Sequence, residues 1–472
     1  MNEDKKIKRY RIELDNRELL PPERDEGREK RRVILISGLI SAILIAIILY
    51  TLPQTVLSFN GLMVYASIVS LVIFLFVLLF RYFSILVLAY LYITKYTVES
   101  YEDYYPFVSI IVPAFNEGVV LKDSVNSLLE LDYPNYEVII VNDGSSDNTA
   151  EIAESLVGNR KGKKSIVKVS LINKANGGKA KALNAGIQYS EAEFIVCMDG
   201  DSQLTPDTLK NAVRHFVDPE VGAVAGNVKI ENRRTFLTDL QALEYVEGLN
   251  MARSAQGQLK QVNIIPGPMG IFRKAALRDS GYYSSDTFAE DADITLKILA
   301  SGWKINYEPN SIALTEAPAK IDQLLKQRYR WTRGIIQAIR KHRKHIYNPT
   351  INFTNTIVLW SMVYEALIWP AMNIFANLFF IVVAGVYGLS SLIFFWWLGI
   401  SLLDFMAAIY CIAVEKEEFR LVPYAIIYRL VFVLLIDITK AMATVEEFLG
   451  LEMEWGKLER TGFKNDKSIA TA

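Results

Sequence analysis

The chain has 472 residues, of which 51% are hydrophobic and 22% are charged, and its formal net charge is −1 at pH 7. A balance this close to zero argues against a nucleic-acid partner, and two distant cysteines, Cys197 and Cys411, exclude a disulfide framework. The chain has only three histidines, so a bound metal would rest on carboxylates, which favours Mg²⁺ or Mn²⁺.

The first 94 residues combine a polar segment with a long apolar one. Residues 1–32 are polar and mixed in charge, and we expect a cytosolic segment; the apolar run starts too late for a secretory signal. No charged residue occurs from 33 to 80, and turn-forming residues interrupt this run, so 33–94 predicts two transmembrane helices. Three basic residues precede the first helix and place its start in the cytoplasm.

The next region, 100–315, alternates between two kinds of pattern. Short β-branched runs bounded by turn residues predict strands, as in "FVSIIVPAF", "YEVIIVNDG", "EFIVCMDGD" and "GAVAGNV". Helix-like stretches separate these runs, and such alternation predicts a parallel α/β sheet. Functional residues are then expected at the carboxyl ends of the strands.

Basic and aromatic residues gather just before the C-terminal apolar region, in "LLKQRYRWTRG" at 324–334. This composition predicts interfacial amphipathic helices over 316–350. Residues 351–443 are apolar and predict transmembrane or interfacial helices, followed by a cytosolic tail at 444–472.

Four crossings are expected within this apolar region, and they would place "EKEEFR" (415–420) outside the cell. The expected segments are 353–370, 371–388, 391–413 and 421–441. The first contains Glu365 and can lie in the membrane interface instead, in which case the last segment is the one expected not to cross.

Carboxylates follow several predicted strands. In "CMDGDSQLTPDTL", Asp199 and Asp201 can share a divalent cation that bridges a diphosphate, or they can form an acidic turn before the next helix. Asp143 in "VIIVNDGSSDNT" can accept hydrogen bonds from a base or a ribose. Phe115 and Glu117 project from the turn in "IIVPAFNEG", where Phe115 can pack on a nucleobase or belong to the core.

Three further motifs can have either a functional or a purely structural role. Lys179 follows two glycines at a predicted helix start, where it can hold phosphate or remain a solvated lysine. The turn "PGPMG" fixes an irregular backbone through Gly267 and Pro268 that lets a ligand approach closely. Glu290, Asp291 and Asp293 lie at the start of a predicted helix, either as a general base site or as acids that complement the helix dipole.

The basic stretch at 324–334 has a helical order of its own. Gln327 and Arg330 lie three residues apart and share a face, and Trp331 lies one turn from Gln327. The forked donors of its arginines suit a diphosphate. A membrane-surface helix with Leu324 and Leu325 toward the bilayer remains the alternative.

In this order, the motifs resemble those of the processive family-2 glycosyltransferases with a GT-A core, such as the hyaluronan, chitin, cellulose and poly-N-acetylglucosamine synthases. The resemblance covers roughly residues 100–345 and rests on "VNDGSSD", the Asp199–Gly200–Asp201 run, "AEDADIT" and the Gln-x-x-Arg-Trp signature. Ala289 stands where the cellulose form has a threonine, which is closer to the poly-N-acetylglucosamine form. The implied fold is an α/β GT-A-like (Rossmann-like) cytosolic domain inserted between α-helical transmembrane segments.

The resemblance also implies a role for each matching residue. Asp291 would be the catalytic base. Donor binding would fall to Phe115, Glu117, Asp143, Lys179, Asp199, Gln327 and Arg330. Acceptor binding would fall to Gly267, Pro268, Glu290 and Trp331. Asp201, with Asp199, would hold Mg²⁺ or Mn²⁺.

The implied activity is an inverting, processive polymerisation of a UDP-sugar, first of all UDP-N-acetylglucosamine, into an extracellular β-linked polysaccharide that the same chain translocates. The partners would be the UDP-sugar, the growing polysaccharide and the lipid bilayer, with a small membrane or export subunit left open. The location would be the cell membrane, multi-pass, with a cytoplasmic catalytic domain. The alternatives are a hyaluronan or glucan synthase, a transferase that adds one sugar to a lipid, and a transporter with a nucleotide-binding domain.

Overall fold

A computed structural model describes residues 62–95, 104–348, 353–387 and 391–451. The chain divides into two compact units, Met1–Ile68 and Val69–Ala472. Of the first unit, only 62–68 are described, as the beginning of a helix. The polar N-terminal segment, the first predicted transmembrane helix and the tail after residue 451 lie outside the described residues.

The second unit contains a nine-stranded sheet with the order β3-β4-β2-β1-β5-β8-β7-β9-β6. The strands are β1 (Val108–Ala114), β2 (Tyr136–Asn142), β3 (Gly158–Lys161), β4 (Ile166–Asn173), β5 (Phe194–Cys197), β6 (Ser202–Leu204), β7 (Val221–Ile230), β8 (Gly270–Arg273) and β9 (Lys304–Thr315). Strands β4, β2, β1 and β5 run parallel, as does the pair β7–β9. Strands β3, β8 and β6 are antiparallel to their neighbours, so the expected all-parallel sheet is mixed. The pattern of apolar residues indicates where a strand lies but not its direction, so the sequence did not predict the antiparallel strands.

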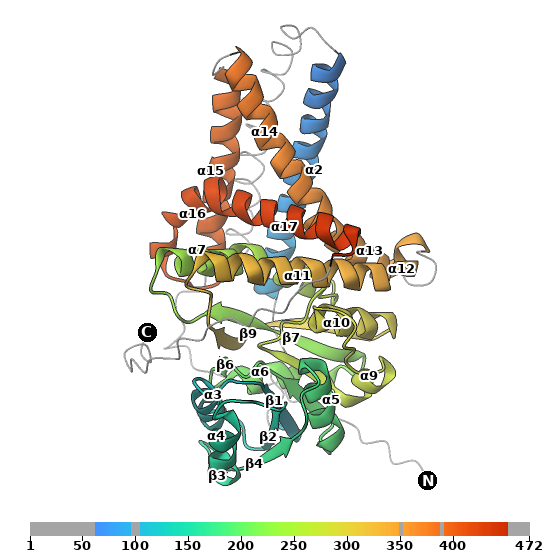
Figure 1. Cartoon of the computed structure of the whole chain (residues 1–472), viewed down its shortest axis with the longest axis vertical. Helices are drawn as coiled ribbons and strands as arrows, with labels where there is room; N and C mark the ends of the chain where they lie inside the picture. Colours follow the sequence, from blue (N-terminus) through green and yellow to red (C-terminus); the bar gives the residue numbers. More distant parts are fainter. Residues whose placement is uncertain (1–61, 96–103, 349–352, 388–390, 452–472) are drawn as a thin grey trace, which may run out of the picture. The chain divides into compact units, whose positions relative to one another are not determined.

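Helices cover both faces of the parallel half of the sheet (Figure 1). Strands β1 and β2 are buried along their whole length, as their unbroken apolar runs require. On one face the core includes residues of α3 (Leu121–Leu129) and α4 (Thr149–Leu156). On the other face it includes residues of α5 (Lys179–Tyr189) and α10 (Glu290–Ala300). The turns that follow the parallel strands therefore all lie at the same edge of the sheet.

A second layer of helices lies beside the sheet. Helix α7 (Phe236–Glu244), the π-helical turn η2 (Tyr245–Asn250) and α8 (Met251–Gln258) follow one another without a break. The basic stretch lies in α11 (Ile321–Lys341), and the short α12 (Lys344–Tyr347) follows it. The shorter α6 (Thr208–Val213) and α9 (Lys274–Asp279) pack against the sheet.

Apolar helices and short helical turns make up most of the rest of the described chain. They are α2 (Leu62–Lys95), α13 (Phe353–Val363), η3 (Tyr364–Ile368), α14 (Trp369–Tyr387), α15 (Ser391–Val414), α16 (Tyr424–Ile427), η5 (Tyr428–Phe432) and α17 (Val433–Leu449). In the described residues, Leu75–Tyr92 and Asn355–Val382 are long and apolar enough to cross a membrane, by length and composition.

The expected break near residue 370 is wrong. Helices α13, η3 and α14 form one uninterrupted run from Phe353 to Tyr387, so the segments 353–370 and 371–388 are a single helix. Pro370 is tolerated because it follows the π-helical turn of η3, where the regular backbone bonding is already shifted.

The expected position of the 415–420 loop, on the far side of the membrane from the sheet, is also wrong. The Asn227 amide at β7 donates to Glu415 Oε2 at 2.8 Å, and Lys229 Nζ lies 2.8 Å from Glu417 Oε1. Arg233 pairs with the same Glu417. The loop is therefore held against β7, because two partly buried cations compensate the carboxylate of Glu417. Helix α17 then runs beside α11 (Figure 1).

Candidate active site

The turns after β1 and β2 hold each other in place. Asn116 has a positive φ of 53°, and its side-chain oxygen accepts a hydrogen bond of 2.7 Å from the Ser146 amide. The Glu117 amide donates to Thr149 Oγ1 at 2.8 Å. Phe115 is 41% exposed, so its ring is at the surface and not in the core.

The buried Asp143 organises the glycine loop that leads into α5. Its carboxylate accepts hydrogen bonds from the amides of Gly177 at 3.0 Å and Gly178 at 2.7 Å, and it pairs with Lys174. Gly178 has a φ of 88°, a left-handed conformation that glycine adopts without strain. The structure thus gives Asp143 a positioning contact to the loop before Lys179; its contact with a nucleoside stays a prediction.

Lys179 joins two carboxylates that are far apart in the sequence. Its Nζ lies 2.6 Å from Asp199 Oδ1 at the end of β5 and 2.6 Å from Glu290 Oε1 at the start of α10. Burial alone would lower the pKa of Lys179, but these carboxylates and Asp291 raise it well above its usual value. The lysine is therefore a partly exposed cation that two carboxylates hold in place at the carboxyl edge of the sheet.

Asp291 lies beside this pair. Burial and the neighbouring carboxylate of Glu290 raise the pKa of Asp291 to about 6. Its Oδ1 accepts a hydrogen bond of 2.8 Å from the amide of Ala292, which fixes the carboxylate at the first turn of α10. A carboxylate with a raised pKa at the edge of a site is suited to accept a proton near neutral pH.

Asp293, the third acid expected at the start of this helix, has a structural role and anchors the helix that carries Asp291. Its fully buried carboxylate lies 2.9 Å from both Lys341 Nζ and His342 Nε2 at the end of α11, and 3.3 Å from Lys297 Nζ. Burial would raise the pKa of Asp293, but the bonds from His342 and Lys341 hold it well below its usual value. The i,i+4 spacing from Asp293 to Lys297 was the only signal of this in the sequence.

The "PGPMG" turn closes the site from the side. A Cβ atom on Gly267 would lie 2.8 Å from Asp199 Oδ2 and 3.1 Å from Lys179 Nζ. The Ile265 amide donates to Thr295 Oγ1 at 3.0 Å, which ties this turn to α10. Only glycine allows the backbone to approach the lysine–carboxylate pair this closely.

Replacing Gly267 by Ala should lower turnover about tenfold, because the new methyl group displaces the charged ends of Asp199 and Lys179 by a few tenths of an ångström. The melting temperature should change little, since both neighbours are flexible side-chain ends. Steady-state transfer rates and thermal melts on purified protein would measure both. Pro268→Ala in the same turn is the control, and an equal loss of turnover in it would contradict the steric explanation.

The Asp199–Asp201 turn fits a divalent cation that arrives with a diphosphate. Asp201 is buried, and its Oδ1 lies 3.4 Å from Ser202 Oγ. A Cβ on Gly200 would lie 3.7 Å from Glu117 Cγ, so the β1 turn borders this site. Among the described residues, no group of three or more His, Cys, Asp or Glu side chains could hold a metal alone. Proteins usually bind Mg²⁺ through one or two carboxylates, and the phosphates of the substrate supply further ligands.

Helix α11, which carries the Gln-x-x-Arg-Trp motif, contacts the start of α10 at Gly334, three residues beyond the motif. A Cβ on Gly334 would lie 2.5 Å from the Ala289 amide, so α11 touches the start of α10. Arg328, one of the arginines expected to suit a diphosphate, is instead buried and lies 2.6 Å from Glu244. Its guanidinium lies over the Trp331 ring at 4.2 Å. The motif is thus presented by a rigid, charge-compensated helix.

The sequence offered a helix surface on which Leu324 and Leu325 both face the bilayer, and the structure does not show this arrangement. Leu324 is fully buried against Leu240, Phe432 and Ile436, because α7 and the η5–α17 helix cover that side of α11. The covering is reinforced by Arg333, whose Nε lies 2.8 Å from Glu447 Oε2.

One compact site therefore contains Lys179, Asp199, Gly267, Glu290 and Asp291. The loops of Phe115, Glu117 and Asp143 lie at the neighbouring strand ends, and α11 with Gln327, Arg330 and Trp331 adjoins the site at Ala289. An acid pair and a lysine at the carboxyl edge of a mixed α/β sheet, with an arginine-bearing helix in contact, are the arrangement expected of a GT-A-type domain.

Comparison with known proteins agrees with this class. Residues 109–281 match the family "Glycosyl transferase family 2". The chain is 34% identical over 259 residues to the poly-beta-1,6-N-acetyl-D-glucosamine synthase of Staphylococcus epidermidis RP62A, covering 55% of this chain and 60% of that protein. It is 34% identical over 228 residues to the synthase of Staphylococcus aureus COL, covering 48% and 54%. The matches thus span little more than half the length of these relatives, and the resemblance to family-2 glycosyltransferases of the poly-N-acetylglucosamine synthase kind is confirmed.

A solved structure shares the fold. The mannosyltransferase PcManGT from Pyrobaculum calidifontis, in complex with GDP-Man and Mn²⁺, superposes with a TM-score of 0.56 at 21% identity, covering 82% of this chain and 99% of that one. At this identity the likeness establishes the GT-A fold alone.

Proposed function

We propose that the chain is a membrane-embedded, inverting glycosyltransferase that polymerises UDP-N-acetylglucosamine into a β-linked polysaccharide. The observation that carries this proposal is the bridge from Lys179 to Asp199 and Glu290, set beside Asp291 and under α11. We infer the donor sugar from the similar proteins, which are named as poly-beta-1,6-N-acetyl-D-glucosamine synthases.

The transfer is a single in-line displacement at the anomeric carbon. The acceptor hydroxyl gives its proton to the Asp291 carboxylate while its oxygen bonds to the anomeric carbon. The bond from that carbon to the diphosphate oxygen breaks, and UDP leaves with the electron pair. Inversion needs only one base, and the pKa of about 6 keeps Asp291 ionised at neutral pH.

The cations of the site stabilise the departing diphosphate. A diphosphate entering beside Asp199 competes for Lys179, which then turns from its carboxylate partners toward the phosphates. Arg330 on α11 adds a forked donor from the other side. A divalent cation held by Asp199 and Asp201 would supply further charge neutralisation.

The nucleoside end of the donor lies over the turns after β1 and β2. Phe115 is exposed there and offers a ring on which a base stacks. Asp143, already hydrogen-bonded to the glycine loop, couples recognition of the nucleoside to the position of Lys179.

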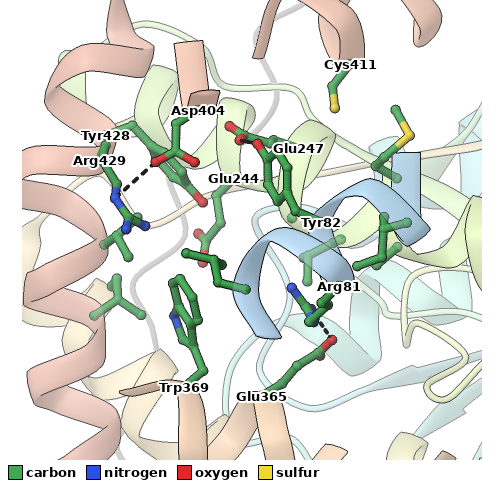
Figure 2. A pocket seen from close by; sticks show the side chains of 18 of the residues that line it. Arg81, Tyr82, Glu244, Glu247, Glu365, Trp369, Asp404, Cys411, Tyr428 and Arg429 are labelled. Atoms are coloured by element: carbon green, nitrogen blue, oxygen red, sulfur yellow. Dashed lines mark hydrogen bonds and ion pairs between the residues drawn. The ribbon is translucent and has the colours of Figure 1, made fainter. Parts of the chain in front are cut away.

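The product leaves through a cavity of about 230 Å³ among the apolar helices. Figure 2 shows its polar lining, in which Arg429 pairs with Asp404 and Tyr82 donates to Glu247. Glu244 also lines this cavity and is the partner of Arg328, which lies against Trp331. Glu244 and Arg328 thus link the cavity to Trp331, which we propose as the residue that stacks on the acceptor. The charged and hydroxyl groups of the cavity offer the hydrogen bonds that a sugar chain needs between membrane helices.

The activity can be tested by incubating purified protein with a panel of UDP-sugars. Mass spectrometry of the products would show which donor is used and how long the product is. We expect long chains from UDP-N-acetylglucosamine, dependent on Mg²⁺ or Mn²⁺. UDP binding without release of the sugar from any donor would favour a transporter or receptor and would contradict the proposal.

A transferase that adds one sugar to a lipid is the second candidate, because it shares the sheet-edge acids. Trp331 separates the two: in a polymerase, Trp331→Ala should shorten the product at least about tenfold, since the acceptor loses its stacking surface. Trp331→Phe, which keeps a ring over Arg328, should retain most of the length. A single-sugar product from the unaltered chain would establish the second candidate.

A further inference from the structure

A hollow of about 620 Å³ lies outside the sugar-transfer site, between the loop before α10 and the end of α11. Asp286 and Thr287 form one wall, and the other carries Arg340, Lys341, Arg343 and Lys344. Four cations face one carboxylate across this space, so the hollow is suited to an anion.

The cations differ in how far they are already compensated. Lys341 is satisfied, since its Nζ lies 2.8 Å from Asp286 and 2.9 Å from Asp293. Arg340 lies 3.5 Å from Glu447, and its side chain remains 48% exposed. Arg343 and Lys344 are exposed and form no salt bridge with any residue in the described ranges.

The wall opposite these cations contains an unused hydrogen-bonding group. The hydroxyl of Thr287 is buried and has no hydrogen-bond partner in the described part of the chain. A buried hydroxyl without a partner is costly. An anion in the hollow would provide its missing acceptor and would also neutralise Arg343 and Lys344.

The surroundings of the hollow indicate a lipid surface. The Thr356 hydroxyl donates to the His345 carbonyl, which ties α12 to the start of the apolar stretch Asn355–Val382. On α17, a stripe of exposed apolar side chains with helical spacing points away from α11; it consists of Ile438, Met442, Val445 and Leu449, with Phe448 beside it. Arg340 lies over the Phe448 ring at 5.7 Å. Cations bordering an exposed apolar stripe are typical of a surface at headgroup level.

We propose that the hollow binds the headgroup of an anionic phospholipid, with the phosphate between Arg340, Arg343, Lys344 and the Thr287 hydroxyl. The apolar stripe favours a lipid over a soluble phosphate, because only a lipid can occupy both surfaces at once. This site rests on the membrane embedding in the proposed function. The headgroup would link the loop that leads to Glu290 with α11, the two elements that meet at the sugar-transfer site.

The test uses the full chain in detergent, titrated with short-chain phosphatidylglycerol or phosphatidylcholine, with bound lipid counted by native mass spectrometry. The unaltered chain should prefer phosphatidylglycerol. In the double variant R343A/K344A this binding should weaken at least about tenfold, since each cation near an anionic lipid contributes to its attraction. The matched control K161A/K163A removes two charges from exposed lysines at strand β3, and it should bind as the unaltered chain does.

Equal binding of the two lipids, or unchanged binding in R343A/K344A, would overturn the site. Displacement of phosphatidylglycerol by inorganic phosphate at equal concentration would show a soluble-anion site and would also overturn it. UDP-sugar turnover is measured on the same preparations. A chain that binds the anionic lipid but transfers no sugar would refute the proposed function while supporting this site.

Discussion

Replacing Asp291 by Asn will lower sugar transfer by about a thousandfold, within the range that a general base contributes. The amide keeps the size of the side chain and can still accept the hydrogen bond from the Ala292 amide, but it cannot take the acceptor proton. Binding of the UDP-sugar should change little, because the donor contacts lie at Lys179 and the strand-end turns. Single-turnover rates and donor binding by calorimetry separate the two effects.

The pH profile gives an independent check of the same assignment. Burial and Glu290 raise the pKa of Asp291 to about 6. The base works only when ionised, so transfer by the unaltered chain should be full above this pH and decline as pH falls through it. The raised pKa also means that the folded state holds this proton more tightly than the unfolded state does. Ionisation therefore costs stability at neutral pH, and Asp291→Asn should melt at a higher temperature there.

Glu290→Gln is the matched control, since Glu290 lies next to Asp291 and pairs with Lys179. We expect it to weaken donor binding more than the chemical step. If Asp291→Asn keeps more than a tenth of the rate while Glu290→Gln abolishes it, the base is Glu290 and the assignment of Asp291 is wrong.

The sequence was sufficient where local patterning decides structure. Asp199 follows a strand because a β-branched apolar run ends there, and Lys179 begins a helix because two glycines allow the turn before it. Parallel strands with a common carboxyl edge then bring these residues near one another. Their meeting at a distance of 2.6 Å follows from that topology.

Local patterning could not predict contacts between residues that are distant in the sequence. The bonds of Asp293 to Lys341 and His342 join α10 to the end of α11 across almost 50 residues. Glu415 reaches Asn227 across 188 residues, and the charge of the 415–420 loop gave no indication that it is buried against β7. Helical periodicity placed the arginines of α11 on faces, but only the positions of Glu244 and Glu447 determine that Arg328 and Arg333 are buried.

Asp201→Asn should cost transfer roughly a hundredfold or more, because the second acid of the Asp199–Asp201 turn would lose its charge in a buried position. The substitution keeps the shape of the side chain, so the fold at β5 and β6 should survive, which circular dichroism can verify. The diagnostic measurement is a titration with Mn²⁺ at fixed UDP-sugar. In the unaltered chain, activity should disappear on chelation and return with Mn²⁺, whereas the variant should need a much higher concentration.

A control for this effect lies in the next strand-end turn. Asp147 accepts a hydrogen bond of 3.0 Å from the amide of Thr149 at the start of α4, so Asp147→Asn changes an equivalent acid without touching Asp199 or Asp201. Its Mn²⁺ requirement should stay as in the unaltered chain. Full activity of Asp201→Asn in the presence of chelator would mean that Lys179 and the arginines of α11 neutralise the diphosphate without a metal.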